Sequence, residues 1–311
     1  MKKSVFARSF AILLISCIFC SILSGCGSSS KSSSSEPPVY SPLRVLVPEA
    51  PGSDTLGSSP LPLDVSNITQ GYFAAQSDSA DLVTSLQITA PTGVLYSYFI
   101  EPAKSAVIPF TEGNGDYTVV GYQQIQGDQY AALYSETLTV ELENEFLPFL
   151  YPNQYVNFSP DSEASKLALS MVSEDTADID ALKQIYNYVV NNLTYDYDKA
   201  ETVETGYLPN VDETLSTKTG ICFDYAALTT AMLRSCDIPC KLQIGYTGDI
   251  KHAWIDVYIR SKGWVTGAVS FNGDSWSLMD PTFDSSADSD DTEAIQDYIG
   301  NADNYTVQFT R

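Results

Sequence analysis

A cysteine follows a glycine and opens an apolar stretch in the sequence Thr219-Gly220-Ile221-Cys222-Phe223-Asp224-Tyr225-Ala226-Ala227-Leu228. The apolar pattern runs to about Ser235 and stops before Pro239, which predicts a helix that begins at Cys222. The first turn of a helix carries unpaired N–H groups and the positive end of the helix dipole, and both stabilise a thiolate. Cys222 is therefore a candidate nucleophile, although a cysteine taken alone is as well explained as a buried core thiol.

A strand pattern follows at residues 252–259, and it begins with His252, the single histidine of the chain. Alternation places Ala253, Ile255, Val257 and Ile259 on one face, where they can pack on the predicted helix. The other face carries His252, Trp254, Asp256 and Tyr258. His252 would then stand at the strand edge where the N-terminus of a helix can meet it.

An aspartate, Asp280, precedes Pro281 directly after a predicted strand at residues 276–279. Cysteine, histidine and a carboxylate are the parts of an activated thiol nucleophile. The thiolate attacks an amide carbonyl, the imidazolium protonates the departing amine, and the carboxylate orients the ring. Taken alone, each residue has a structural explanation: Cys222 as a core thiol, His252 as a hydrogen-bonded strand residue and Asp280 as part of a turn. The presence of all three motifs in one chain favours a catalytic triad.

The motifs together resemble those of the transglutaminase-like superfamily, a circularly rearranged papain-type fold. The matching residues are Gly220-x-Cys222-x-Asp224-Tyr225-Ala226, Ile238-Pro239, Gly245-Tyr246, His252-Ala253-Trp254-Ile255-Asp256-Val257 and Met279-Asp280-Pro281-Thr282. The resemblance covers about residues 165–285 and implies that Cys222 is the nucleophile, His252 the base and Asp280 the orienting acid. The family often has Glu in the histidine strand, whereas Asp256 stands here with a shorter reach.

Helical patterns come first and strand patterns follow them, which predicts an α+β domain over residues 155–311. We expect helices after Ser159-Pro160 and from about Asp178, followed by the helix at Cys222. We expect strands at residues 241–246, 252–259, 264–270 and 276–279. Helices followed by a run of antiparallel strands agree with the transglutaminase-like resemblance.

The preceding region, residues 63–150, has a different pattern of period two, broken by turn residues. Strands are expected at residues 86–89, 96–100, 117–120 and 138–142. Several short strands in this length predict an all-β sandwich of immunoglobulin type. The region contains no His and no Cys, so we interpret it as a spacer or recognition module rather than a catalytic domain.

The first residues have the pattern of a bacterial lipoprotein signal peptide, residues 1–25. A basic start is followed by an apolar run from Phe10 to Leu23, which is short of the ~20 apolar residues that span a bilayer. Leu23-Ser24-Gly25-Cys26 resembles a lipobox, in which Cys26 is acylated. The Ser- and Pro-rich residues 26–62 are expected to be an extended tether. The alternative is an ordinary secreted protein cleaved near Gly25.

Acidic residues dominate the charge, with 39 Asp+Glu against 16 Lys+Arg and a formal net charge of −23. Such a chain repels phosphate backbones, so we expect no nucleic-acid partner. The expected partners are a protein or cell-wall peptide substrate and the membrane, reached through the lipid anchor at the extracytoplasmic face. No cofactor and no metal are expected: zinc lacks further ligands, and the acidic run at residues 284–293 fits no EF-hand.

Two aromatic residues are candidates for contact with substrate. Tyr195 follows the second predicted helix, in a region that lines the cleft in the family that the sequence resembles. The alternative for Tyr195 is an aromatic edge of the core. Trp254, on the face of His252, is the second candidate. Cys236 and Cys240 are interpreted as core residues, with a disulfide between them left open.

Three classes of function remain compatible with the sequence. The first is a cysteine peptidase or amidase, the second is an acyl transferase that joins a glutamine-type amide to an amine, and the third is a binding or scaffold protein with a vestigial triad. The intact triad favours an enzyme. Hydrolysis is the default because water is always present, whereas transfer needs a site that binds the amine and shields the thioester.

Overall fold

The computed structural model describes residues 36–266, 269–271, 276–278 and 305–311. Cys26, Asp280 and the acidic run at residues 284–293 lie outside the described residues. Within the described ranges, no helix has both the length and the apolar character required to cross a bilayer.

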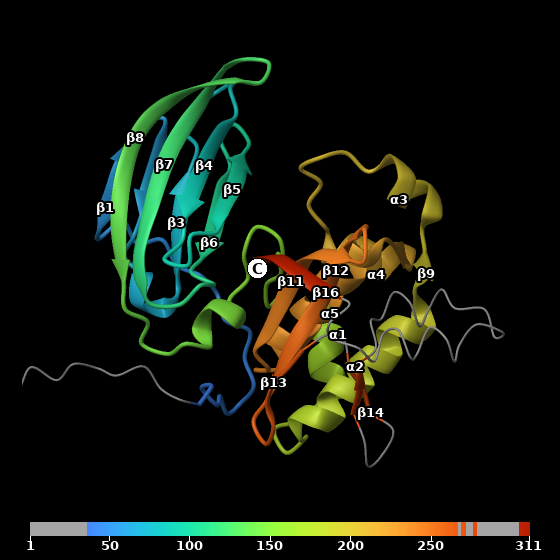
Figure 1. Cartoon of the computed structure of the whole chain (residues 1–311). Coiled ribbons are helices and arrows are strands. Elements are labelled where there is room, and N and C mark those ends of the chain that lie inside the picture. The colour runs from blue at the N-terminus through green and yellow to red at the C-terminus, as the bar shows by residue number, and fades with distance from the viewer. Residues whose placement is uncertain (1–35, 267–268, 272–275, 279–304) are drawn as a thin grey trace, which may run out of the picture. The chain divides into compact units, whose positions relative to one another are not determined.

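Two four-stranded antiparallel sheets make up the N-terminal part of the described chain (Figure 1). The first has the order β1-β2-β3-β6 and the second the order β5-β4-β7-β8. Their bounds are β1 Thr55–Ser58, β2 Leu61–Asp64, β3 Tyr72–Gln76, β4 Thr84–Thr89, β5 Leu95–Ile100, β6 Ser105–Pro109, β7 Gly115–Gln126 and β8 Gln129–Val140. Short 3-10 helices lie at Ile68–Gln70 and Leu147–Phe149.

The two sheets share one hydrophobic core, as the sheets of a β-sandwich do. Leu63 and Phe73 of the first sheet belong to the same buried cluster as Leu86 and Val119 of the second. The alternation in β5 buries every second residue and leaves Leu95, Ser97 and Phe99 exposed on its other face. The prediction of a β-rich region ahead of the α+β domain is confirmed.

The structure describes residues 36–62 of the segment expected to be a tether. These residues pack against the folded chain. Val45, Leu46 and Leu61 are buried, and the Glu49 N–H donates a hydrogen bond of 2.8 Å to the Tyr72 hydroxyl. Proline keeps this chain extended, and an extended chain can lay its apolar side chains against a neighbouring surface. Within this range, Thr55–Ser58 form β1 and pair with β2, so part of the expected tether belongs to the first sheet.

Five helices follow within the described chain: α1 Glu163–Met171, α2 Asp178–Asn192, α3 Tyr197–Thr202, α4 Val211–Thr217 and α5 Cys222–Ser235. The predicted stripe of α2 is confirmed, since Leu182, Ile185 and Val189 are buried. Helix α1 begins later than expected because the Ser159 hydroxyl accepts a hydrogen bond from the Asp161 N–H and forms a turn instead of a helix cap.

Helix α5 is the central helix of this part, and its residues 224–235 are all buried. It begins where the Ile221 N–H donates to the Asp224 carboxylate, which satisfies one orphan donor of the first turn. It ends before Asp237, whose φ of 62° cannot continue a helix, and Pro239 follows. The helix is buried on every side because other elements surround it.

A four-stranded antiparallel sheet of order β13-β12-β11-β16 lies against α5 (Figure 1). Its strands are β11 Cys240–Thr247, β12 Ile250–Ile259, β13 Gly263–Val265 and β16 Tyr305–Thr310. Ala253, Ile255 and Val257 of β12 share a core cluster with α5, as their alternation predicted. The predicted strand at residues 264–270 is two strands, β13 and β14 Val269–Phe271, and β14 pairs with β15 Trp276–Leu278.

Candidate active site

Cys222 is the first residue of α5, a free thiol that is partly exposed. The chain reaches it from α4 through Lys218, which has a φ of 55°, and through β10 Thr219–Gly220. A Cβ on Gly220 would lie 2.6 Å from the Asp224 Cβ, so this approach requires glycine. The tight turn places Cys222 at the helix N-terminus, where N–H groups have no acceptor within the helix.

His252 lies near the start of β12 and pairs in register with Gly245 of β11. Its side chain is buried at 6% exposure. A Cβ on Gly245 would lie 1.9 Å from the Thr306 oxygen, so glycine is required for β16 to approach β11 at this position. The approach brings the Tyr305 ring to 6.5 Å from the His252 ring.

Cys222 and His252 line the same cleft, which has a volume of about 520 Å³. Other lining residues come from β5, from the chain between residues 195 and 208, and from Ile250 and Lys251 of β12. A larger hollow of about 910 Å³ is lined by neither Cys222 nor His252. The structure therefore places two members of the predicted triad at one site, while Asp280 lies outside the described residues.

The two aromatic candidates for substrate contact occupy different environments. Tyr195, in β9 Thr194–Tyr195, lines the cleft, so contact with substrate stays a prediction for this residue. Trp254 is 1% exposed and is not among the residues that line this cleft. Its ring lies beside those of His252 and Tyr305, at centroid distances of 6.3 and 5.0 Å. This position favours packing behind the histidine over contact with substrate.

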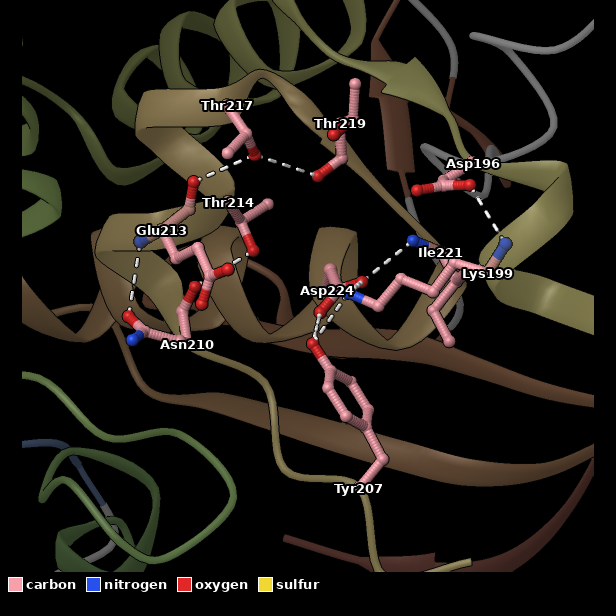
Figure 2. Close-up of polar contacts among 10 residues, drawn as sticks. All are labelled: Asp196, Lys199, Tyr207, Asn210, Glu213, Thr214, Thr217, Thr219, Ile221 and Asp224. Carbon is pink, nitrogen blue, oxygen red and sulfur yellow. Dashed lines mark hydrogen bonds and ion pairs between the residues drawn. The ribbon is translucent and has the colours of Figure 1, made fainter. Parts of the chain in front are cut away.

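Asp224, two residues after the candidate nucleophile, is the centre of a polar network that the sequence analysis did not identify (Figure 2). Its side chain is fully buried. Oδ2 accepts hydrogen bonds from the Ile221 N–H and the Lys199 ammonium, both at 2.8 Å. Oδ1 accepts one from the Tyr207 hydroxyl at 2.5 Å, and Lys199 also donates to that hydroxyl at 2.7 Å.

The network shifts the pKa values of two of its members, Tyr207 and Lys199. Burial raises the pKa of Tyr207 to about 12, and the hydrogen bond to Asp224 adds to the effect, so the hydroxyl remains a donor at neutral pH. Burial by itself would lower the pKa of Lys199, yet the hydrogen bonds to Asp224 and Tyr207 outweigh it and raise that pKa. The buried Asp224 side chain therefore accepts hydrogen bonds from one cation, Lys199, and from two neutral donors, the Tyr207 hydroxyl and the Ile221 N–H.

Two cleft residues were missed by the sequence analysis: Phe309 of strand β16 and Arg311, which directly follows that strand. The Arg311 guanidinium lies 4.2 Å from the Tyr155 ring centroid, and its Nη1 donates to the Tyr98 hydroxyl at 2.9 Å. The sequence does contain a strand pattern at this place, because Tyr305, Val307 and Phe309 alternate with polar residues.

The other two described cysteines, Cys236 and Cys240, are free and buried. Burial raises the pKa of each thiol to about 12, so both remain thiols at neutral pH. Within the described ranges, no group of three or more His, Cys, Asp or Glu side chains is arranged to hold a metal ion.

A comparison with protein families supplies the decisive match. Residues 165–267 match the sequence profile of the transglutaminase-like superfamily. This range contains both Cys222 and His252. The chain carries a transglutaminase-like domain. Within that domain, α5 supplies the cysteine and β12 the histidine.

Two curated proteins are similar to parts of the chain. The UPF0252 protein MJ1282 of Methanocaldococcus jannaschii is 40% identical over 62 residues, which is 18% of this chain and 18% of that protein. The protein YebA of Bacillus subtilis is 24% identical over 183 residues, which is 51% of this chain and 25% of that protein. The chain thus aligns with a quarter or less of the length of each relative.

Two solved structures are also similar to the chain. A proposed cysteine protease of Cytophaga hutchinsonii has 15% identity and a TM-score of 0.37, and the match covers 78% of this chain and 79% of that one. Red sea bream transglutaminase has 13% identity and a TM-score of 0.28, with coverage of 70% and 48%. The assignment of the transglutaminase-like domain rests on the sequence match over residues 165–267.

Proposed function

We propose that the chain is a lipid-anchored, extracytoplasmic cysteine peptidase or amidase. The observation that supports this function best is the placement of Cys222, at the N-terminus of a buried helix, and of His252, on the adjacent sheet, in one cleft. In this proposal Asp280 orients the imidazole, and the substrate is a protein or a cell-wall peptide.

Acylation begins when the Cys222 thiolate attacks the carbonyl carbon of the scissile amide and forms a C–S bond. The helix N–H groups at Cys222 face the oxygen on which negative charge develops. The tetrahedral intermediate collapses as the C–N bond breaks, and the His252 imidazolium gives its proton to the departing amine nitrogen. The product is a thioester on Cys222 and a free amine.

Deacylation uses a water molecule in the place that the amine has left. Neutral His252 takes a proton from this water, whose oxygen forms a bond to the thioester carbon. The C–S bond then breaks, so the carboxylic acid leaves and the thiolate–imidazolium pair is restored. A primary amine in place of water would give a new amide, which is the transglutaminase reaction.

The experiment that tests the proposal incubates the full chain with a mixed peptide library, with and without a labelled primary amine. Mass spectrometry identifies the products, and Cys222→Ala is the control. We expect cleaved peptides that depend on Cys222. Label incorporated into a glutamine side chain would instead establish transfer, and no Cys222-dependent product in any library would favour a binding or scaffold role.

A further inference from the structure

One wall of the cleft is formed by a single segment, residues 194–208, which we call the cleft wall. It consists of β9, α3 and the chain that follows α3. The segment supplies several cleft-lining residues, namely Tyr195, Ala200, Val203, Glu204, Thr205, Gly206, Tyr207 and Leu208. Val203 and Leu208 are large apolar residues with exposed fractions of 37% and 38%. The cleft wall therefore presents apolar side chains to whatever occupies the cleft.

The start of the cleft wall is attached to the turn that leads to Cys222. Strand β9 pairs in parallel with β10, with Tyr195 opposite Gly220. The Thr194 N–H donates to the Lys218 oxygen and the Asp196 N–H to the Gly220 oxygen, both at 2.9 Å. These backbone bonds fix the first residues of the segment relative to the nucleophile, but they do not extend to residues 203–208.

The rest of the cleft wall is attached through side chains, and its two polar attachments end at Asp224 (Figure 2), while the Tyr207 ring also packs on the Phe223 ring with centroids 6.3 Å apart. The Lys199 ammonium lies 2.8 Å from Oδ2 of Asp224, and the Tyr207 hydroxyl lies 2.5 Å from Oδ1. Lys199 comes from α3 and Tyr207 from the chain after it, so the two bonds bracket residues 200–206. Lys199 also lies 4.5 Å from the centre of the Tyr207 ring, which ties the two attachments together.

Asp224 belongs to the first turn of α5, whose first residue is Cys222. The cleft wall and the nucleophile therefore share one anchoring residue. The Tyr207 hydroxyl has one hydrogen, which it donates to Asp224. Tyr207 is thus engaged in holding the wall and does not have that hydrogen available for a substrate oxygen. Lys199 uses two of its three ammonium hydrogens in the same network, one on Asp224 and one on Tyr207.

We propose that Lys199 and Tyr207 are positioning residues that, by binding Asp224, hold the cleft wall at the distance from Cys222 at which Val203 and Leu208 accept an apolar side chain of the substrate. This inference rests on the proposed function, because it takes the cleft as the site that binds the acyl group. It adds to that function a class of substrate, a peptide with a large apolar side chain close to the scissile amide.

The test measures the covalent reaction of Cys222 in the full chain, which requires no turnover. Three probes are used: iodoacetamide, a peptidyl chloromethyl ketone with phenylalanine next to the reactive group, and the same compound with glycine. The rate for the phenylalanine probe divided by that for the glycine probe measures recognition by the cleft wall. Iodoacetamide measures the reactivity of the thiol by itself.

We expect the wild type to react faster with the phenylalanine probe than with the glycine probe. In Lys199→Met the ratio of these two rates should fall about tenfold, because the cleft wall is displaced. The rate with iodoacetamide should stay within about twofold, since the thiol and helix are unchanged. Lys199→Arg should retain most of the preference, because its guanidinium can also pair with a carboxylate. The matched control is Lys166→Met, which removes an exposed pair with Glu163 on α1.

A second variant allows the proposal to be tested even if Lys199→Met fails to fold. Val203→Ser changes only the exposed surface of the wall and should also lower the preference. A Lys199→Met protein that folds and keeps the full preference would overturn the proposal. An equal loss with all three probes would overturn it too, because the network would then act on the nucleophile. A wild-type Cys222 that reacts with none of the probes would instead contradict the proposed function.

Discussion

The imidazole of His252 lies beside the indole of Trp254, with ring centroids 6.3 Å apart and an angle of 17° between the ring planes. Both side chains project from β12, two positions apart, and Trp254 is among the largest fully buried residues. A large rigid ring at this place restricts the positions that the histidine can adopt. The pair therefore connects the packing of the sheet with the geometry of the cleft.

Trp254→Ala should lower the free energy of unfolding by about 3–5 kcal/mol, the usual effect of truncating a buried tryptophan. It should also slow the alkylation of Cys222, because His252 loses its neighbour. Urea denaturation and iodoacetamide kinetics measure the two effects. Ile125→Ala, at a residue with 61% exposure, is the control and should change stability by less than about 0.5 kcal/mol. A loss below about 1 kcal/mol for Trp254→Ala would contradict a buried role.

Among the described cysteines, iodoacetamide at neutral pH should modify Cys222 and leave Cys236 and Cys240 unmodified. Burial raises the pKa of the latter two thiols to about 12, whereas Cys222 is partly exposed. Peptide mapping by mass spectrometry identifies the labelled residue. In urea all three should react, because unfolding returns the buried thiols to a pKa of about 8.5. Faster labelling of Cys236 or Cys240 in the folded protein would show that the nucleophile is misassigned.

His252→Ala should slow the alkylation of Cys222 at mildly acidic pH by at least about tenfold, because the imidazolium that stabilises the thiolate is lost. The difference should shrink at alkaline pH, where the thiol ionises without help. The rate of iodoacetamide labelling between pH 5 and 9 gives the profile. Identical profiles for the wild type and His252→Ala would show that the two side chains do not act together.

Asp237 carries a buried carboxylate that should make stability depend on pH. Burial raises its pKa to about 6, although the Tyr40 N–H and Arg260 act in the opposite direction. The folded state therefore holds the proton more tightly than the unfolded state, whose pKa is 3.8. The resulting stability is complete below about pH 4 and is lost as the pH rises through about 6.

Asp237→Asn removes this ionisation and should raise the free energy of unfolding at pH 7.5 by about 1–3 kcal/mol relative to the wild type, with no gain at pH 4. Asparagine also accepts the φ of 62° at this position. Urea denaturation at the two pH values measures the effect. Asp128→Asn, on the exposed turn between β7 and β8, is the control and should show no such dependence. A loss of stability at pH 7.5 would mean that the pair with Arg260 outweighs burial.

The lipid anchor is tested at Cys26. The wild-type protein should partition into the detergent phase, and Cys26→Ser should release the protein or block its processing, because two acyl chains hold a protein stably at a bilayer. Phase partitioning and the intact mass of the mature protein are the measurements. A wild-type protein found wholly in the soluble fraction would exclude the anchor.

The elements that depend on local pattern could be predicted before the structure was known. Residues 222–235 were predicted as a helix beginning at Cys222, and the apolar alternation of residues 253–259 correctly assigned the face of β12 that packs on α5. Glycine at positions 220 and 245, together with Cys222 and His252, gave the resemblance to the transglutaminase-like superfamily. Helix and strand periodicity is a property of neighbouring residues, so it can be read before the fold is known.

The side chains that meet across the site could be identified only from the folded chain. Asp224 is bonded to Lys199, 25 residues away, and to Tyr207, 17 residues away, while Arg311 reaches Tyr98 over 213 residues. Alternation could place Trp254 on the face of His252, but it could not show that Tyr305 of β16 buries that face. Such contacts depend on how separate elements pack, and no local pattern encodes the partner of a buried charge.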